Sequence, residues 1–277
     1  MRVHVDLMEV GSCRHPACMV TGRASLAVAR FPALVACIIH PVEGVFLFDT
    51  GYGEGLSRSR DPVARAYRRL LPYRLTAGEA CCHQLAAAGI DRGDVRGIIL
   101  SHLHPDHAGG LVDFPGAAVF TSAEVLSGMR TGSWRCRARL GLISDLFPIS
   151  LEGRTRTVES CRSASRSLAG LPTGADLLGD GSLIAIPLPG HAPGHIGLLL
   201  TAQNGREVLL AADAAWLSVC IRERLEPMAP ARAFVADYPA YRRTLHALHD
   251  LSLLQPDLCI VPSHCGEAIA ALRHELC

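Results

Sequence analysis

Short runs of apolar residues, separated by turn residues, follow one another through the first fifty positions of the chain. The N-terminal stretch alternates polar with apolar residues, and two later runs are joined by Pro-Val-Glu-Gly at 41–44. Alternation indicates a half-buried strand, and two short apolar runs joined by a tight turn indicate a hairpin. The pattern therefore predicts β-strands over 2–10, 33–40 and 45–51.

Farther along the chain, apolar strands alternate with segments of helical character. An alanine-rich segment at 75–90 predicts a helix with Thr76 as its N-cap and Gly89 near its end. Gln-Asn-Gly-Arg at 203–206 predicts a two-residue hairpin turn. The other expected elements are strands within 94–100, 117–122, 182–195, 196–216 and 256–265, and helices starting near Ser122 and spanning 239–254 and 266–276.

Several of these strands lead directly into side chains that bind metals. The loops are His-Leu-His-Pro-Asp-His at 102–107, Pro-Gly-His-Ala-Pro-Gly-His at 189–195 and Pro-Ser-His-Cys at 262–265, and a fourth strand ends at Asp213. Loops that follow strands are where α/β folds place their chemistry. One such histidine alone would more often be structural, but five histidines and two aspartates together indicate a metal site. They are His102, His104, His107, His191, His264, Asp106 and Asp213.

The first of these loops has ligands for two ions rather than one. His102 and His104 project to the same side, because side chains of an extended segment repeat with a period of two. Pro105 then turns the chain, so that Asp106 and His107 cannot easily share the same coordination sphere. The loop therefore offers ligands to two neighbouring ions.

Residues from the other loops complete the two sets. A carboxylate such as Asp213 can bridge neighbouring ions, while His191 and His264 each complete one sphere. Neutral imidazole with few carboxylates suits Zn²⁺ best, although iron or manganese could occupy the same ligands. We expect two divalent ions as cofactors.

Taken together, these motifs resemble those of the metallo-β-lactamase-fold hydrolases. The resemblance rests on the loops described above and on Leu-Phe-Asp-Thr-Gly-Tyr at 47–52, in the family's order. It implies an α/β fold, an αβ/βα four-layer sandwich of two mixed sheets flanked by helices. Asp49 would hold a ligand histidine in its orientation. The implied ligands are His102, His104 and His191 for one ion and Asp106, His107 and His264 for the other, with Asp213 bridging.

Within the family, the paired histidine motifs look most like the N-acyl-homoserine lactonase branch. This implies a dinuclear metal-dependent hydrolase, in which a hydroxide bridging the ions attacks a lactone or ester carbonyl. Asp106 is the candidate catalytic residue that carries a proton to the leaving group. The branch has a tyrosine three residues after the bridging aspartate, where this chain has Trp216, whose indole has no proton to transfer. Trp216 and Tyr52, a phenol from another loop, are the substrate-pocket candidates.

Two other functions fit the same motifs. Residues 130–166 carry eight arginines and three acidic residues, within a less regular stretch at 128–175. This stretch is either a solvated surface excursion or a cover over the site, whose arginines would meet the phosphates of coenzyme A or an acyl carrier. A thiolate leaves without strong help from an acid, so thioester hydrolysis is compatible with Trp216, which has no proton to transfer. Acyl-thioester hydrolysis is therefore the alternative activity, and a metal-containing binding protein of low turnover is the third.

Composition narrows the range of partners. The 277 residues carry a net charge of +1 and are 49% hydrophobic, which indicates one compact domain over 1–277 and gives no field that would attract nucleic acid or a membrane. No apolar run reaches the roughly 18 residues of a membrane span. The N-terminus lacks the pattern of a signal peptide, and the eleven cysteines are scattered, so we expect a cytoplasmic protein. The resemblance implies a small acyl molecule as its substrate. The sequence leaves the oligomeric state open.

Overall fold

The computed structural model describes residues 1–130, 133–147 and 151–276. Its strands are β1 (His4–Pro16), β2 (Val28–His40), β3 (Gly44–Phe48), β4 (Tyr73–Arg74), β5 (Val95–Ile99), β6 (Ala118–Thr121), β7 (Thr155–Thr157), β8 (Arg162–Ser163), β9 (Ala175–Asp176), β10 (Leu183–Pro187), β11 (Ile196–Thr201), β12 (Glu207–Ala212) and β13 (Cys259–Pro262). Its α-helices are α1 (Cys18–Thr21), α2 (Gly55–Arg58), α3 (Pro62–Leu70), α4 (Cys81–Ala87), α5 (Pro105–Ala108), α6 (Ala123–Met129), α7 (Trp134–Arg139), α8 (Leu151–Arg154), α9 (Ser218–Glu223), α10 (Ala229–Arg232), α11 (Tyr238–Leu254) and α12 (Gly266–Leu276).

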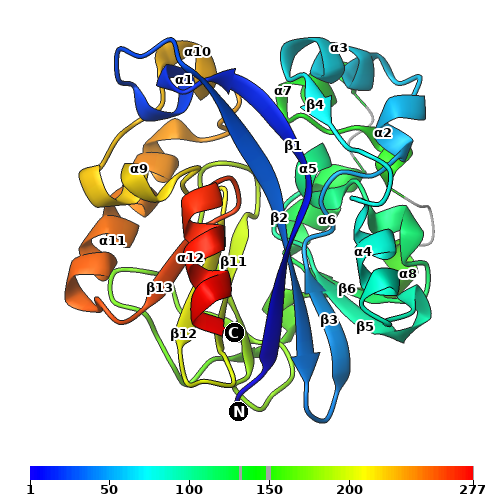
Figure 1. The fold of residues 1–277 in the computed structure, drawn as a ribbon, viewed down its shortest axis with the longest axis vertical. Helices are drawn as coiled ribbons and strands as arrows, with labels where there is room; N and C mark the ends of the chain where they lie inside the picture. The colour runs from blue at the N-terminus through cyan, green and yellow to red at the C-terminus, as the bar shows by residue number, and fades with distance from the viewer. Residues whose placement is uncertain (131–132, 148–150, 277) are drawn as a thin grey trace.

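These strands form two mixed sheets that pack face to face, with helices on the outside (Figure 1). The first sheet has the strand order β4-β1-β2-β3-β5-β6-β7, and the second has the order β13-β12-β11-β10-β9-β8. In the first sheet β3, β5 and β6 run parallel, and in the second β12 and β13 do. Helices α4 and α8 lie outside the first sheet and α9 and α11 outside the second. This is the four-layer αβ/βα sandwich that the sequence predicts.

The central strands are buried on both faces, which explains their continuous apolar runs. In β2, Leu34, Ala36 and Ile38 belong to the core between the sheets, whereas Val35 and Cys37 belong to the core beneath the outer helices. Successive residues of a strand face opposite sides of the sheet. A strand covered on both sides therefore needs apolar residues at every position.

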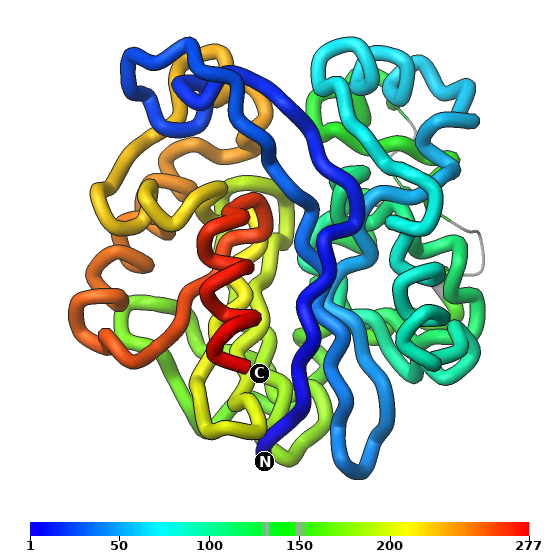
Figure 2. Tube along the Cα trace, viewed as in Figure 1, coloured from blue at the N-terminus to red at the C-terminus, as the bar shows by residue number. Residues whose placement is uncertain are grey.

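The C-terminal helix α12 packs beside β1 and closes one side of the sandwich (Figure 2). Its Ile269 and Leu272 belong to the core between the sheets. The Arg273 guanidinium donates hydrogen bonds to the Leu7 carbonyl from Nε at 3.0 Å and from Nη2 at 2.8 Å. Across the described ranges, no helix combines the length and apolar character needed to cross a bilayer.

Two local predictions were wrong. Helix α4 begins at Cys81 with Ala80 at its N-cap, rather than next to Thr76. A turn precedes it, because Gly78 takes a φ of +87° and the Glu79 carboxylate accepts the Thr76 backbone N–H at 2.6 Å. The helix ends at Ala87, and Gly89 lies near its end as expected, with a φ of +79°.

The predicted hairpin after β11 is present, but its loop is one residue longer than expected. The Ala202 backbone N–H donates to the Arg206 carbonyl at 2.8 Å, which leaves 203–205 as the loop. Gly205 closes the loop with a φ of +88°. A three-residue loop that ends in a left-handed glycine is the common alternative to the two-residue turn.

Part of the stretch at 128–175 belongs to the sheets. Strand β7 pairs with β6 at one edge of the first sheet, and β8 pairs with β9 in the second. Helix α7 precedes both strands in sequence, and the 131–132 and 148–150 portions of the stretch fall outside the described residues. The stretch therefore contributes edge strands to both sheets.

Candidate metal centre

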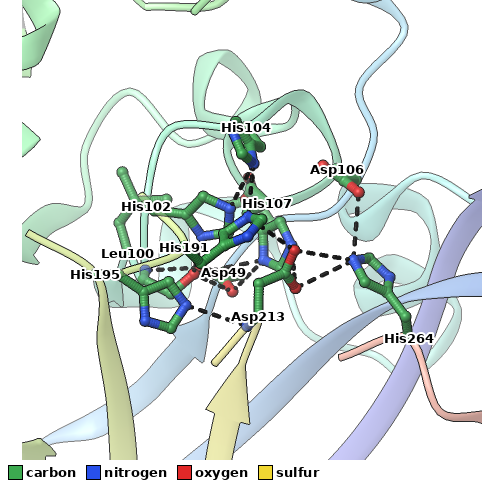
Figure 3. A network of polar contacts seen from close by, with 12 residues as sticks. Asp49, Leu100, His102, His104, Asp106, His107, His191, His195, Asp213 and His264 are labelled. Carbon is green, nitrogen blue, oxygen red and sulfur yellow. Dashed lines mark hydrogen bonds and ion pairs between the residues drawn. The ribbon is translucent and has the colours of Figure 1, made fainter. Parts of the chain in front are cut away.

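The candidate ligands gather where strands of both sheets end (Figure 3). The first sheet supplies the loop after β5, in which α5 carries Asp106 and His107. The second sheet supplies His191 after β10, Asp213 directly after β12, and His264 two residues after β13. The structure brings together all seven residues that the sequence singled out as metal ligands.

Their donor atoms form two groups. Within each group, the donor atoms lie within 4.8 Å of one another. The first group contains His102, His104, His191 and Asp213, and the second contains Asp106, His107 and His264. In the first group, His104 Nδ1 lies 3.0 Å from His102 Nε2 and 3.0 Å from His191 Nε2.

The Asp213 carboxylate lies between the two groups. Its Oδ2 is 3.1 Å from His191 Nε2, on the side of the first group. Its Oδ1 is 3.2 Å from His107 Nε2 and 3.1 Å from His264 Nε2, on the side of the second. Asp106 Oδ2 reaches His264 Nε2 at 3.5 Å. One carboxylate thus connects both groups.

Hydrogen bonds on the outer side of the rings fix which nitrogens face inward. His104 Nε2 lies 3.1 Å from the Leu140 carbonyl, His264 Nδ1 lies 2.6 Å from the Pro32 carbonyl, and His107 Nδ1 lies 2.7 Å from an Asp49 oxygen. Carbonyl and carboxylate oxygens only accept, so these outer nitrogens carry the hydrogens. The inner nitrogens of the neutral rings therefore present lone pairs to the centre of each group.

This donor set fits two divalent cations. The lone pairs of His102 Nε2 and His104 Nδ1 face one another at 3.0 Å and repel unless a cation lies between them. Donors on a tetrahedral ion, each about 2.0–2.1 Å from it, stand about 3.3 Å apart, close to the separations here. Among the described residues, the buried His107 Nε2 and Asp213 Oδ1 lie 3.2 Å apart, but neither atom makes a contact with hydrogen-bond geometry.

Burial and neighbouring charges shift the pKa of several of these groups. Burial and the adjacent imidazoles hold the pKa of His102 well below its usual range and lower that of His104 to about 3. Burial opposes the charged form of His107, but the Asp213 and Asp49 carboxylates raise its pKa well above the ordinary value. Against its own burial, Asp213 has its pKa lowered by His264, His107 and His191. A charged carboxylate thus sits among imidazoles, a setting in which a metal ion competes directly with protons.

Asp49 anchors the histidine loop from β3. Its oxygens accept the Ser101 backbone N–H at 2.8 Å, the Ser101 hydroxyl at 2.8 Å and the His107 Nδ1–H at 2.7 Å. Because Ser101 Oγ donates to Asp49, it accepts the Nδ1–H of His102 at 2.9 Å. Asp49 takes a φ of 60°, which few residues other than glycine adopt. One buried carboxylate thus orients a histidine of each group.

The two substrate-pocket candidates have other partners. The Trp216 indole N–H donates to Asp213 Oδ2 at 3.1 Å, and the side chain is 9% exposed. Tyr52 is 1% exposed, and its hydroxyl lies 3.2 Å from that of Tyr67. The structure therefore places Trp216 beside the shared carboxylate and the buried Tyr52 beside the half-buried Tyr67.

Sequence reasoning missed three groups that support the site. His195 accepts the Asp213 backbone N–H on Nε2 at 3.1 Å and donates from Nδ1 to the Leu188 carbonyl at 2.9 Å. The second histidine of Pro-Gly-His-Ala-Pro-Gly-His was a signal for this role. Ser101 and the Leu140 carbonyl are the other two, and nothing in the sequence marks them.

Comparison with known proteins gives a family match over most of the chain. The family model of the metallo-beta-lactamase superfamily matches residues 33–264. An N-acyl homoserine lactonase, AttM, of Rhizobium radiobacter is 32% identical over 145 residues, which are 51% of this chain and 49% of that protein. A probable metallo-hydrolase of Mycobacterium tuberculosis is 27% identical over 82% of this chain and 73% of its own length. The chain thus spans about half the length of the curated lactonase.

Solved structures share the whole fold at low identity. An N-acyl homoserine lactone hydrolase with N-hexanoyl-L-homoserine at its catalytic metal centre has a TM-score of 0.72 at 17% identity, over 98% of this chain and 97% of that one. AidC, described as a dizinc quorum-quenching lactonase, has a TM-score of 0.64 at 15% identity, over 96% and 88%. The fold, the donor groups and the family match agree, and the chain belongs to the metallo-beta-lactamase superfamily.

Proposed function

We propose that this protein is a dinuclear metal-dependent hydrolase that cleaves a lactone or ester bond in a small acyl substrate. His102, His104 and His191 would hold one ion and Asp106, His107 and His264 the other. The observation that carries the proposal is the Asp213 carboxylate, whose two oxygens face the two groups at 3.1 and 3.2 Å. Zn²⁺ suits this set of nitrogen and oxygen donors best.

Two ions bound there would lower the pKa of a shared water towards about 7 and polarise the carbonyl of the substrate. The chain's own residues hold the donors in place through Asp49, Ser101 and His195. Asp106 can carry a proton to the leaving group, because its carboxylate lies at the edge of the second group and keeps a small exposed surface. The lactonases among the relatives support a lactone as the substrate class.

The experiment is metal analysis followed by turnover of matched lactones, esters and thioesters. We expect about two ions per chain, and hydrolysis that is lost in His191→Ala and Asp213→Ala. His4→Ala is the control, because that histidine side chain is 40% exposed and pairs with Asp6 on the surface. A metal-loaded protein that is inert towards all three classes would overturn the proposal and favour a binding protein instead.

Acyl-thioester hydrolysis is the second candidate, and the position of Trp216 favours it. The indole N–H is committed to Asp213, and the Tyr52 hydroxyl is committed to Tyr67. A thiolate or another good leaving group departs without strong acid help. A series of esters and thioesters graded by leaving-group pKa separates the two candidates. A rate that falls steeply as this pKa rises supports the thioesterase, and a flat profile supports lactone hydrolysis assisted by Asp106.

A further inference from the structure

The Trp216 side chain packs against the Asp213 carboxylate, which lies between the two donor groups. Its indole N–H donates to Asp213 Oδ2 at 3.1 Å. The ring lies edge-on to His191 with centroids 5.8 Å apart, and 6.2 Å from the ring of Tyr241. With 9% of its surface exposed and contacts on both sides, the indole has little freedom to move.

The two oxygens of Asp213 are not equivalent. Oδ2, which accepts the indole N–H, lies 3.1 Å from His191 Nε2 of the first group. Oδ1 lies 3.2 Å from His107 Nε2 of the second group. His264 Nε2 reaches both oxygens, at 3.1 Å for Oδ1 and 3.3 Å for Oδ2. The indole therefore acts on the oxygen that faces the first group.

The backbone and the side chain of Asp213 are held by different residues. His195 Nε2 accepts the Asp213 backbone N–H at 3.1 Å, which fixes the backbone. The rotation of the carboxylate about its own bonds remains, and an N–H donor aimed at one oxygen restricts it. Partners of this kind orient metal ligands, and their loss typically costs about 10–100-fold in metal affinity.

We infer that Trp216 is a positioning residue that aims Asp213 Oδ2 at the His102, His104 and His191 group, so that ion binding there depends on residue 216. Ion binding at the Asp106, His107 and His264 group depends on it much less. The inference rests on the proposed function, because it presupposes that both groups hold ions.

The test uses Trp216→Phe, which keeps an aromatic ring and removes the N–H. Stepwise Zn²⁺ affinities are measured by competition with a chelator on metal-free protein, and Co²⁺ spectra report the geometry of each site. We expect one site to weaken by about 10–100-fold and the other by less than about 3-fold. Trp134→Phe is the matched control, because it removes the other tryptophan of the chain, 59% exposed at the start of α7.

A double-mutant cycle assigns the weakened site. In a His191→Ala background the first group is incomplete, so Trp216→Phe should then change the remaining affinity by less than about 3-fold. Equal weakening of both sites, or no weakening of either, would overturn the inference and leave Trp216 as a packing residue. A wild-type protein that binds no metal would instead overturn the proposed function.

A second measurement does not depend on the folding of Trp216→Phe. In the Trp134→Phe protein, Trp216 is the remaining tryptophan, and its emission reports on the carboxylate that accepts its N–H. We expect the emission to change with the equivalent of Zn²⁺ that fills the first group, and not in Trp134→Phe combined with His191→Ala. An emission change that persists in that combination would contradict the inference.

Discussion

At the scale of single residues, Asp49 connects the histidine loop to the first sheet. Its carboxylate is fully buried and accepts three hydrogen bonds, two from Ser101 and one from His107. These bonds offset the cost of its φ of 60°, which is of order 1–3 kcal/mol for a residue other than glycine. The strained backbone of Asp49 is therefore retained because its carboxylate orients a histidine ring in each donor group.

Replacement of Asp49 by asparagine should weaken metal binding without removing the backbone geometry, because asparagine also tolerates a positive φ. The amide turns a donor towards one of the three hydrogens that the carboxylate now accepts. We expect a loss of about 10–100-fold in metal affinity and about 1–3 kcal/mol in the free energy of unfolding. Chelator competition and urea denaturation measure the two effects.

Asp6→Asn is the control for that variant, because the Asp6 side chain is 61% exposed and pairs with His4 on the surface. It should leave both quantities unchanged. If Asp49→Asn bound metal as tightly as the wild type, the carboxylate would not be what orients the histidines.

Asp106→Asn tests proton transfer. The amide keeps the shape of the side chain but cannot carry a proton. At saturating Zn²⁺, with full occupancy checked by metal analysis, we expect kcat for a lactone to fall by about 10²–10⁴-fold. The fall should be much smaller for a thioester, whose thiolate needs no proton. Equal kcat for both proteins on the lactone would remove Asp106 from the proposed chemistry.

At the scale of elements, the end of helix α7 reaches over the first donor group. The Leu140 carbonyl accepts the Nε2–H of His104 at 3.1 Å. Gly141 follows with a φ of +66°, and a Cβ built there would lie 2.9 Å from His104 Cδ2. The helix is tied to the start of α3 by Arg137, which lies 2.5 Å from Asp61. This segment of the arginine-rich stretch therefore covers a proposed metal ligand.

Gly141→Ala should displace the His104 ring from its position beside His102 and His191. We expect Zn²⁺ affinity at the first group to fall by at least about 10-fold. Loss of a contact that orients a metal ligand typically lowers metal affinity by that factor or more. Competition with a chelator on the metal-free variant measures this directly.

The chain offers a closely matched control in Gly89→Ala. Gly89 also follows a helix with a positive φ, of +79°, but a Cβ there meets nothing within 4 Å. Both variants carry the same backbone strain, of order 1 kcal/mol. If the two variants bound zinc equally well, the contact between Gly141 and His104 would have no bearing on the site.

Arginines of the same stretch have distinct partners. Arg137 pairs with Asp61, Arg166 with Glu207, and Arg154 donates to the Phe114 and Ala117 carbonyls. Arg135 and Arg139 are exposed on α7, next to the segment that covers His104.

Under the thioesterase alternative, the double variant Arg135→Gln with Arg139→Gln should raise KM for an acyl-CoA several-fold and leave KM for an uncharged thioester unchanged. Steady-state kinetics with both substrates measures this. An unchanged KM for the acyl-CoA would mean that the two arginines do not contact the phosphates of the substrate.

The elements differ in how far the sequence could predict them. Strands such as β2 and β12 are continuous apolar runs, so local pattern alone identifies them. The start of α4 depended on the left-handed turn at Gly78, which competes with the N-cap preference of Thr76. The two-residue spacing of His102 and His104 predicted that their side chains project to the same side of the loop. The Leu140 carbonyl is a backbone group 36 residues away, which no side-chain pattern marks.

At the scale of the whole molecule, stability should depend on pH through the buried histidines. Burial and the neighbouring His191 lower the pKa of His104 and of His195 to about 3. In the unfolded chain a histidine takes up a proton near pH 6.5. Below that pH the unfolded state therefore binds more protons than the folded state, and stability falls as the pH falls.

We expect the metal-free protein to lose stability between pH 6.5 and pH 5, measured as the urea midpoint. The raised pKa values of His107 and His264 favour the folded state by an amount that is nearly complete at pH 6.5 and constant below it, so they leave this loss largely in place. Zinc present well above its dissociation constant should raise the free energy of unfolding at pH 7 by about 2.7 kcal/mol for each site at a 100-fold excess, and the urea midpoint rises with it. A metal-free midpoint that stays constant over this pH range would contradict the neutral state of the buried rings.

The donors come from both sheets, and this sets an order of events in time. A growing chain that has produced His102 to His107 holds only part of each group, and His264 is the last donor to be made. The second group closes only after β13 has joined β12 and the two sheets have docked, with contacts as remote in sequence as Leu34 to Ser263. Such long-range contacts form late and slowly. An ion at the second group would therefore be bound only late in folding, and a chain cut before His264 would leave Asp106 and His107 without their third donor.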